Sequence, residues 1–179
     1  LSNLFFFSVT LQPKTWEYVN LIIDIGNTAT KMAIFEEGEI KETTRCSNQS
    51  LEGLTALCDR YPIRKGILSS VVSINADMRH QLERLPFPVV EFTYRTPIPI
   101  RNLYRTPQTL GMDRLAAVVA AYTQKPHCPA LVIDAGTCIT YDFIDDQNNY
   151  LGGAISPGIR LRYEALHNYT AKLPLPLLS

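Results

Sequence analysis

A repeated strand-and-turn unit constrains the fold of this chain more than any other feature. Near the start, the apolar run Tyr18–Ile23 ends in Asp24 and turns on the sequence Ile-Gly-Asn-Thr. Far downstream, the apolar run Ala130–Ile133 ends in Asp134 and turns on Ala-Gly-Thr. Each turn leads into a predicted β-hairpin, so both the sequence and its context repeat. The repeat predicts an α/β protein built from two equivalent units.

Apolar periodicity and turn residues predict the remaining elements. The clearest helix, Met112–Gln124, is rich in Ala, Leu and Val, and it follows an irregular proline-bearing loop at Thr96–Thr109. Ser50 is predicted to be the N-cap of an earlier helix. The other predicted strands are Lys31–Phe35, Glu39–Thr44, Gly66–Val72, Phe87–Phe92, Ile139–Ile144 and Tyr150–Ile155, and the other predicted helices are Ser50–Tyr61, Asn75–Leu85 and one that begins at Ile159.

The repeat divides the chain into an extension without function at residues 1–18, a first unit at 19–128 and a partial second unit at 129–179. The apolar run Leu4–Val9 is far shorter than the roughly 20 residues that span a bilayer, so we expect no membrane partner. A formal net charge of zero disfavours nucleic acid as a partner. Four cysteines without metal-ligand spacing and three scattered histidines predict reduced thiols, no zinc site and a cytoplasmic location.

The first turn has the groups that a phosphate site needs. Gly26 lets the backbone approach an oxyanion closely, and the amides of Asn27 and Thr28 can point at phosphate oxygens. Asp24 can hold Mg²⁺ as a carboxylate ligand, and Lys31 is close enough in sequence to reach a phosphate. A single turn of this kind is equally consistent with a purely structural role. The second copy, with Gly136 and Thr137, favours a phosphate-binding cleft between the two turns.

A third motif, Gly111-Met112-Asp113-Arg114, stands at the start of the Ala-rich helix. Asp113 can be a general base for a substrate hydroxyl, with Arg114 binding an anionic group of the substrate. It can equally stabilise the helix N-terminus through its charge and hydrogen bonds. A fourth motif, Gly152–Gly158, indicates close backbone approach by a ligand or another strand. The sequence leaves these alternatives open.

Four motifs in this order resemble the type III pantothenate kinases, which belong to the superfamily of sugar kinases, actin and Hsp70 with its ribonuclease H-like fold. The motifs are Asp24–Lys31 (DIGNTATK), Gly111–Arg114 (GMDR), Asp134–Thr140 (DAGTCIT) and Gly152–Gly158 (GGAISPG). The resemblance extends over about residues 20 to 174. Members of the family continue beyond the point at which this chain stops, so the resemblance implies a C-terminally truncated second copy.

The resemblance implies ATP-dependent phosphorylation of pantothenate, the first step of coenzyme A synthesis, by a cytoplasmic homodimer. Asp113 matches the family's general base. Asp24 and its turn match the site for ATP phosphates and Mg²⁺, and Thr137 matches a nucleotide contact. Asp134 is similar to the ligand of a monovalent cation, K⁺ or NH₄⁺. The residues that look like the pantothenate-binding set are Tyr104, Gly111, Met112, Asp113 and Arg114.

Three other hypotheses remain at this stage. The chain can be another small-molecule kinase of the same superfamily, although the Gly-Met-Asp-Arg motif argues against this. It can be a non-catalytic regulator similar to the Bvg accessory factor, although the retention of Asp24, Asp113 and Asp134 favours an enzyme. It can also be an inactive, shortened product.

Overall fold

The computed structural model describes residues 19–176, which form a mixed α/β fold with two sheets. The first sheet has the strand order β3-β2-β1-β4-β5 and the second has the order β6-β9-β8-β7. The strands are β1 (Val19–Ile25), β2 (Ala29–Glu36), β3 (Glu39–Ser47), β4 (Ile63–Ser70), β5 (Val89–Glu91), β6 (Arg101–Asn102), β7 (Ala130–Ala135), β8 (Cys138–Ile144) and β9 (Asn149–Pro157). The helices are α2 (Leu54–Arg60), α3 (Ala76–Glu83), α4 (Met112–Gln124), α5 (Ile159–Asn168) and the short 3₁₀ helix η3 (Pro107–Thr109).

The first sheet is centred on β1, whose residues are all buried. β2 pairs with it antiparallel and β4 pairs with it parallel on the other side. Leu21 and Ile23 of β1 share one core with Leu57 of α2 and Met78 of α3. Because side chains alternate across a strand, Ile22 points to the opposite face, where it joins the core around α4.

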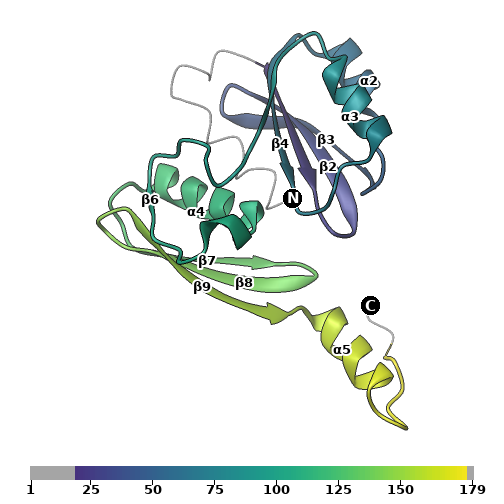
Figure 1. Cartoon of the computed structure of the whole chain (residues 1–179), viewed down its shortest axis with the longest axis vertical. Helices are drawn as coiled ribbons and strands as arrows, with labels where there is room; N and C mark the ends of the chain where they lie inside the picture. The colour runs from purple at the N-terminus through teal and green to yellow at the C-terminus, as the bar shows by residue number, and fades with distance from the viewer. Residues whose placement is uncertain (1–18, 177–179) are drawn as a thin grey trace.

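Helix α4 lies between the two sheets and joins them into one core (Figure 1). Leu115, Val118 and Val119 are fully buried there, together with Val132 of β7 and Ile144 of β8. Burying each such side chain contributes roughly 1.5–3 kcal/mol relative to leaving it exposed. The helix is thus the structural link that sets one strand-and-turn unit against the other.

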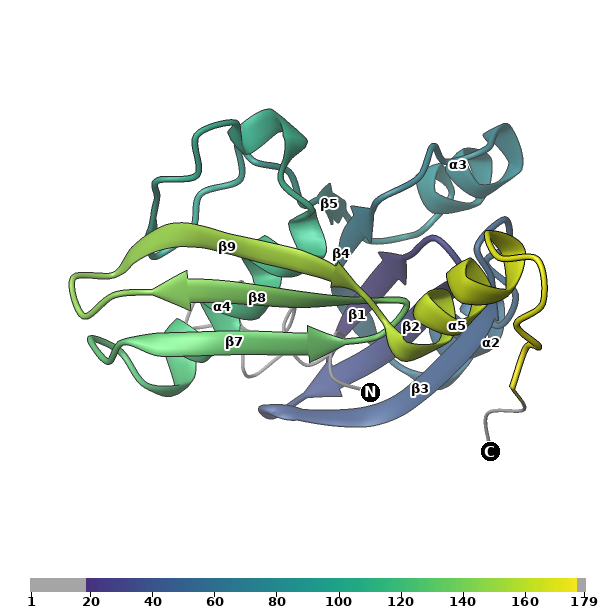
Figure 2. The same cartoon turned by 90° about the horizontal axis from the view of Figure 1, so that it is seen from below.

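The second sheet repeats the hairpin of the first but lacks its cover. β7 corresponds to β1, yet it is an edge strand, whereas β1 is flanked on both sides. Among residues 19–176, no helix covers the face opposite α4, and α5 lies beyond the end of β9 (Figure 2). Leu131, Ile133 and Phe143 are accordingly 59%, 56% and 40% exposed. The predicted α/β class, with a duplicated unit whose second copy is incomplete, is confirmed.

Three details differ from the sequence predictions. Helix α2 begins at Leu54 rather than near Ser50, because the N-cap residue Gly53 adopts a left-handed conformation with φ 91°. The prediction of Ser50 as the N-cap is wrong, since its hydroxyl accepts a hydrogen bond from the amide of Glu52 instead. The proline-bearing loop also contains β6, which pairs with β9 in the second sheet.

The structure does not test the predicted boundaries of the two repeated units at residues 19 and 129. β6 lies upstream of residue 129 and yet joins the second sheet, so the division at 128 and 129 stays a prediction. The extension at residues 1–18 and its apolar run lie outside the described residues. Within residues 19–176, no helix is long and apolar enough to span a bilayer.

Candidate active site

A cleft of about 390 Å³ lies between the two repeated turns and the start of α4. It brings together every residue predicted for the phosphate, metal-ion and base roles. These are Asp24, Gly26, Asn27, Thr28, Lys31, Asp113, Asp134, Gly136 and Thr137. The remaining lining residues are Ala29, Arg45, Val71, Cys138 and Thr140. The placement agrees with the sequence prediction, while the roles of the individual residues stay predictions.

The first wall of the cleft is the turn between β1 and β2. Asp24 is the penultimate residue of β1, and its cross-strand partner on β2 is Lys31. The turn closes with a hydrogen bond from the Gly26 amide to the Ala29 carbonyl at 3.0 Å. Asn48, just after β3, donates to the Asn27 carbonyl at 2.6 Å and holds the turn from outside.

The second wall is the turn between β7 and β8, which is one residue shorter. Its closing hydrogen bond runs from the Gly136 amide to the Cys138 carbonyl at 2.9 Å. The amide of Gly158, at the end of the fourth motif, donates to the Thr137 carbonyl at 2.9 Å. A Cβ at Gly158 would collide with the carbonyl oxygens of Gly136 and Thr137. This glycine therefore permits the close approach that supports the second turn.

Burial sets the charge state of the two inner carboxyls. Burial raises the pKa of Asp24 to about 6; Lys31 opposes the rise, and the charges of Asp113 and Asp134 add to it. Burial also raises the pKa of Asp113, against a hydrogen bond from the Arg114 amide and with a further rise from Asp134. Three carboxylates from three elements thus repel one another, which is the setting in which a bound cation is stabilising.

Asp113 lies in the first turn of α4, directed back toward the helix start. The N-cap residue of α4 is Gly111 and not Asp113. Any contribution of Asp113 to the helix start therefore comes from within the first turn. Its Oδ1 accepts the Arg114 amide at 2.9 Å, which satisfies one of the free amides of the first turn. A Cβ at residue 111 would collide with this oxygen, so glycine leaves room for the carboxylate in its present position.

Arg114 is held away from the cleft by a buried ion pair. Its Nε donates to both carboxylate oxygens of Asp142, at 3.1 and 3.0 Å, and its Nη2 donates to Oδ1 at 2.6 Å. Tyr150 donates its hydroxyl to the same Oδ1 at 2.6 Å. Arg114 is 5% exposed and Asp142 is 1% exposed. The same side chain was predicted to contact substrate. Its pairing with Asp142 instead gives it a positioning role beneath the site, so the two roles compete for one guanidinium.

Tyr104 lies on a neighbouring surface. Its ring stacks on Tyr150 with centroids 6.2 Å apart, and the Arg114 guanidinium lies 5.6 Å from its centroid. Tyr104 lines a second cavity of about 480 Å³ together with Gly152 and Gly153. Met112 packs against the core around α4. Of the predicted pantothenate set, Asp113 alone lines the cleft, and Tyr104 faces the second cavity.

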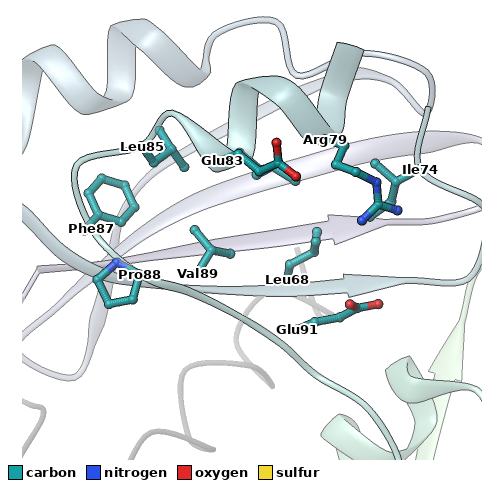
Figure 3. A pocket seen from close by; sticks show the side chains of 10 residues that line it. Leu68, Ile74, Arg79, Glu83, Leu85, Phe87, Pro88, Val89 and Glu91 are labelled. Carbon is teal, nitrogen blue, oxygen red and sulfur yellow. The ribbon is translucent and has the colours of Figure 1, made fainter. Parts of the chain in front are cut away.

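A third hollow, of about 320 Å³, lies between α3 and strands β4 and β5 (Figure 3). Leu68 and Val89 line it from the strands, and Leu85 lines it from the segment after α3; all three belong to or pack against the core under α3 (Figure 3). The charged groups at its rim are Arg79, Glu83 and Glu91. It shares no lining residue with the cleft. We assign it no role in the chemistry of the site.

Comparison with known proteins identifies the family. A family model described as type III pantothenate kinase matches residues 20–177. A type III pantothenate kinase from Phocaeicola vulgatus is 60% identical over 156 residues, which are 87% of this chain and 64% of that protein. One from Bacteroides fragilis is 52% identical over 157 residues, 88% of this chain and 65% of that protein. The chain belongs to the type III pantothenate kinase family.

The match is partial in length. The chain spans about two thirds of the curated type III pantothenate kinases that it matches. Among solved structures, the activator of the 2-hydroxyisocaproyl-CoA dehydratase from Clostridium difficile superposes with a TM-score of 0.45 at 13% identity, over 83% of this chain and 50% of that chain.

Sequence reasoning missed two residues in and around this candidate site. Asp142 has no motif around it, and only the packing of α4 on β8 brings it to Arg114. Arg45 lines the cleft from β3 and lies opposite Lys31, but the predicted strand ended at Thr44, one residue before it. Within residues 19–176, no three His, Cys, Asp or Glu side chains are close enough to hold a metal ion by themselves.

Proposed function

We propose that the protein phosphorylates pantothenate with ATP, which is the first step of coenzyme A synthesis. The observation that carries this proposal is the meeting of Asp24, Asp113 and Asp134 with Lys31 in one cleft between two equivalent turns. Phosphoryl transfer needs this combination of a phosphate cradle, offsetting cations and a base. Membership of the type III pantothenate kinase family supports the choice of pantothenate as acceptor.

The two turns are proposed to hold the phosphates of ATP. Asn27 and Thr28 line the cleft on one wall, and Gly136 and Thr137 line it on the other, so their backbone amides are the proposed phosphate donors. Mg²⁺ usually binds through one or two carboxylates, waters and substrate phosphates, so the absence of a three-ligand cluster in the described residues is compatible with it. Asp24 fits as the Mg²⁺ carboxylate, because a bound cation would offset the burial and the neighbouring carboxylate charges that raise its pKa, and Asp134 fits as the ligand of K⁺ or NH₄⁺. The cations would offset charge on the transferring phosphoryl group.

Asp113 is proposed to be the general base. Its carboxylate lines the cleft next to both aspartate turns, and Gly111 leaves it room. Burial keeps the pKa of Asp113 above the ordinary value, which brings a carboxylate closer to the working range of a base at neutral pH. The Asp142 pair fixes Arg114 and with it the first turn of α4, so the geometry of the base is set in advance.

Pantothenate is proposed to enter from the side of Tyr104. This ring lines the neighbouring cavity together with Gly152. A Cβ at residue 152 would lie only 3.2 Å from the Tyr104 ring, so the glycine leaves space beside that ring. The homodimeric state and the cytoplasmic location implied by the family stay predictions.

The test is transfer of labelled phosphate from ATP to a panel of pantothenate, acetate and a hexose. The chain is compared with a longer version that carries the C-terminal third of the Phocaeicola vulgatus relative. We expect transfer to pantothenate by the longer version, and slow transfer by the chain alone because the second sheet is bare on one face. Transfer to the hexose or acetate instead would contradict the proposed substrate. Equal turnover by both versions would contradict the expected weakness of the chain alone.

A further inference from the structure

Arg45 lies in the cleft without an assigned role. It is on β3, the edge strand of the first sheet, and lines the cleft together with both aspartate turns. We propose that Arg45 is the second cation of the phosphate site and binds the phosphates that stay on the nucleotide. This inference rests on the proposed kinase function and names a residue that the motifs did not assign.

The strand register places Arg45 in a row of charged side chains. Asp24 on β1 is the partner of Lys31 on β2, and Lys31 is the partner of Arg45 on β3. Directly opposed residues of antiparallel strands share a face of the sheet. All three residues line the cleft, so the row crosses its first wall from the centre of the sheet to its edge.

The two cations of this row differ in what they already contact. The charge of Lys31 lowers the pKa of Asp24, so the carboxylate next to it offsets part of its own charge. Arg45 donates no side-chain hydrogen bond and forms no ion pair with the residues that the structure describes. Its five N–H donors are therefore available for an anion, and a guanidinium can bind two phosphate oxygens at once.

The end of β3 is fixed against the phosphate turn. Asn48, three residues after Arg45, donates to the Asn27 carbonyl at 2.6 Å. Asn75, the N-cap of α3, donates to the Gln49 carbonyl at 3.0 Å and holds the same segment from the other side. Arg45 is thus carried on a backbone that is tied to the first turn, rather than on a separate loop.

Its position also separates Arg45 from the reacting group. Asp113 acts on the charge of Asp24 at the centre of the sheet, and Arg45 lies two strands further out. Neighbouring strands are about 4.8 Å apart, so the offset is about 10 Å. If the transferred phosphoryl group lies at Asp113, Arg45 faces the other end of the phosphate chain. It should therefore affect binding of ATP and of ADP alike.

The test is isothermal titration of the chain with inorganic tripolyphosphate and with ADP. Arg45→Ala should weaken the binding of both by about tenfold, as expected for loss of a charged hydrogen bond. Arg45→Gln, which keeps the length of the side chain, should lose nearly as much. Lys41→Ala is the matched control, since Lys41 is an exposed cation on the same strand that pairs with Glu39 and does not line the cleft. It should bind like wild type.

The outcomes distinguish this inference from the function on which it rests. If the Arg45→Ala variant binds both probes as tightly as the Lys41→Ala control, the role of Arg45 is overturned and the kinase proposal stays intact. A loss with tripolyphosphate but none with ADP would place Arg45 at the transferred group and overturn its assignment to the retained phosphates. A wild-type chain that binds neither probe would contradict the phosphate cleft itself, and this inference with it.

Discussion

Replacing Asp142 with asparagine removes the negative charge that Arg114 faces inside the protein. Both side chains are almost fully buried, and three N–H···O hydrogen bonds join them. Asparagine keeps the shape of the side chain and can still accept the Tyr150 hydroxyl. The guanidinium would then be a buried charge without a counter-charge, and we expect a loss of about 3–5 kcal/mol in the free energy of unfolding.

The assay is unfolding by urea and by heat at neutral pH, with circular dichroism as the signal. For a chain of this size, a loss of 3–5 kcal/mol corresponds to roughly 6–20 °C in melting temperature. A double-mutant cycle with Arg114→Leu and Asp142→Leu separates charge from packing. Either leucine variant alone should be strongly destabilised, whereas the double variant should be close to wild type, because no buried charge is left in it. A cost below about 1 kcal/mol for Asp142→Asn, or additive single effects, would refute this account of the pair.

Three further predictions concern the carboxylates of the cleft. The folded-state pKa of Asp24 is raised to about 6 from 3.8, so folding disfavours its charged form and the free energy of unfolding falls as pH rises through this window. Asp24→Asn should therefore gain up to about 3 kcal/mol in the free energy of unfolding at pH 8 and little at pH 4, measured by urea unfolding. Asp113→Asn should lower pantothenate turnover about 10²–10⁴-fold in the longer version with unchanged ATP binding, and near-normal turnover would leave Asp113 with a structural role only. Asp134→Asn should weaken activation by potassium, and an unchanged potassium response in steady-state assays would exclude it as the cation ligand.

The cleft could be predicted from the sequence because its parts are local. A strand that ends in Asp and turns on Gly places the carboxylate and the turn amides within a few residues of one another. The repeat then indicated that two such turns face each other. Lys31 was predicted from its closeness in sequence to the first turn, and the structure makes it the partner of Asp24 across the hairpin.

The Arg114 pair could not be predicted, because its partners are far apart in the sequence. Asp142 meets Arg114 only because α4 packs across β8, and neither residue carries a local signal of this contact. The sequence predicts that Arg114 binds substrate, and this stays a prediction; the buried pair with Asp142 gives the same side chain a positioning role in the first turn of α4.

The glycine motif at residues 152–158 shows how far composition alone can go. The pattern predicted close backbone approach by a ligand or by another strand, and the choice needed the structure. A Cβ at Gly153 would collide with the Tyr141 carbonyl on β8, so the near neighbour there is a strand. At Gly158 it is the second phosphate turn. The motif therefore acts on the site indirectly, through the backbone that supports the turn.

The two repeated units share a backbone but not a charge pattern, and this difference supports the separate roles proposed for them. The partner of Asp24 across the first hairpin is Lys31, and the partner of Asp134 across the second is Thr140. A carboxylate that faces a lysine is already offset, and its wall has a further cation in Arg45 for anionic phosphates. Asp134 has a threonine rather than a lysine opposite it in its hairpin, and this difference favours it as the proposed ligand of the monovalent cation. The asymmetry therefore supports the proposed binding of phosphates and Mg²⁺ on the first wall and of the monovalent cation on the second.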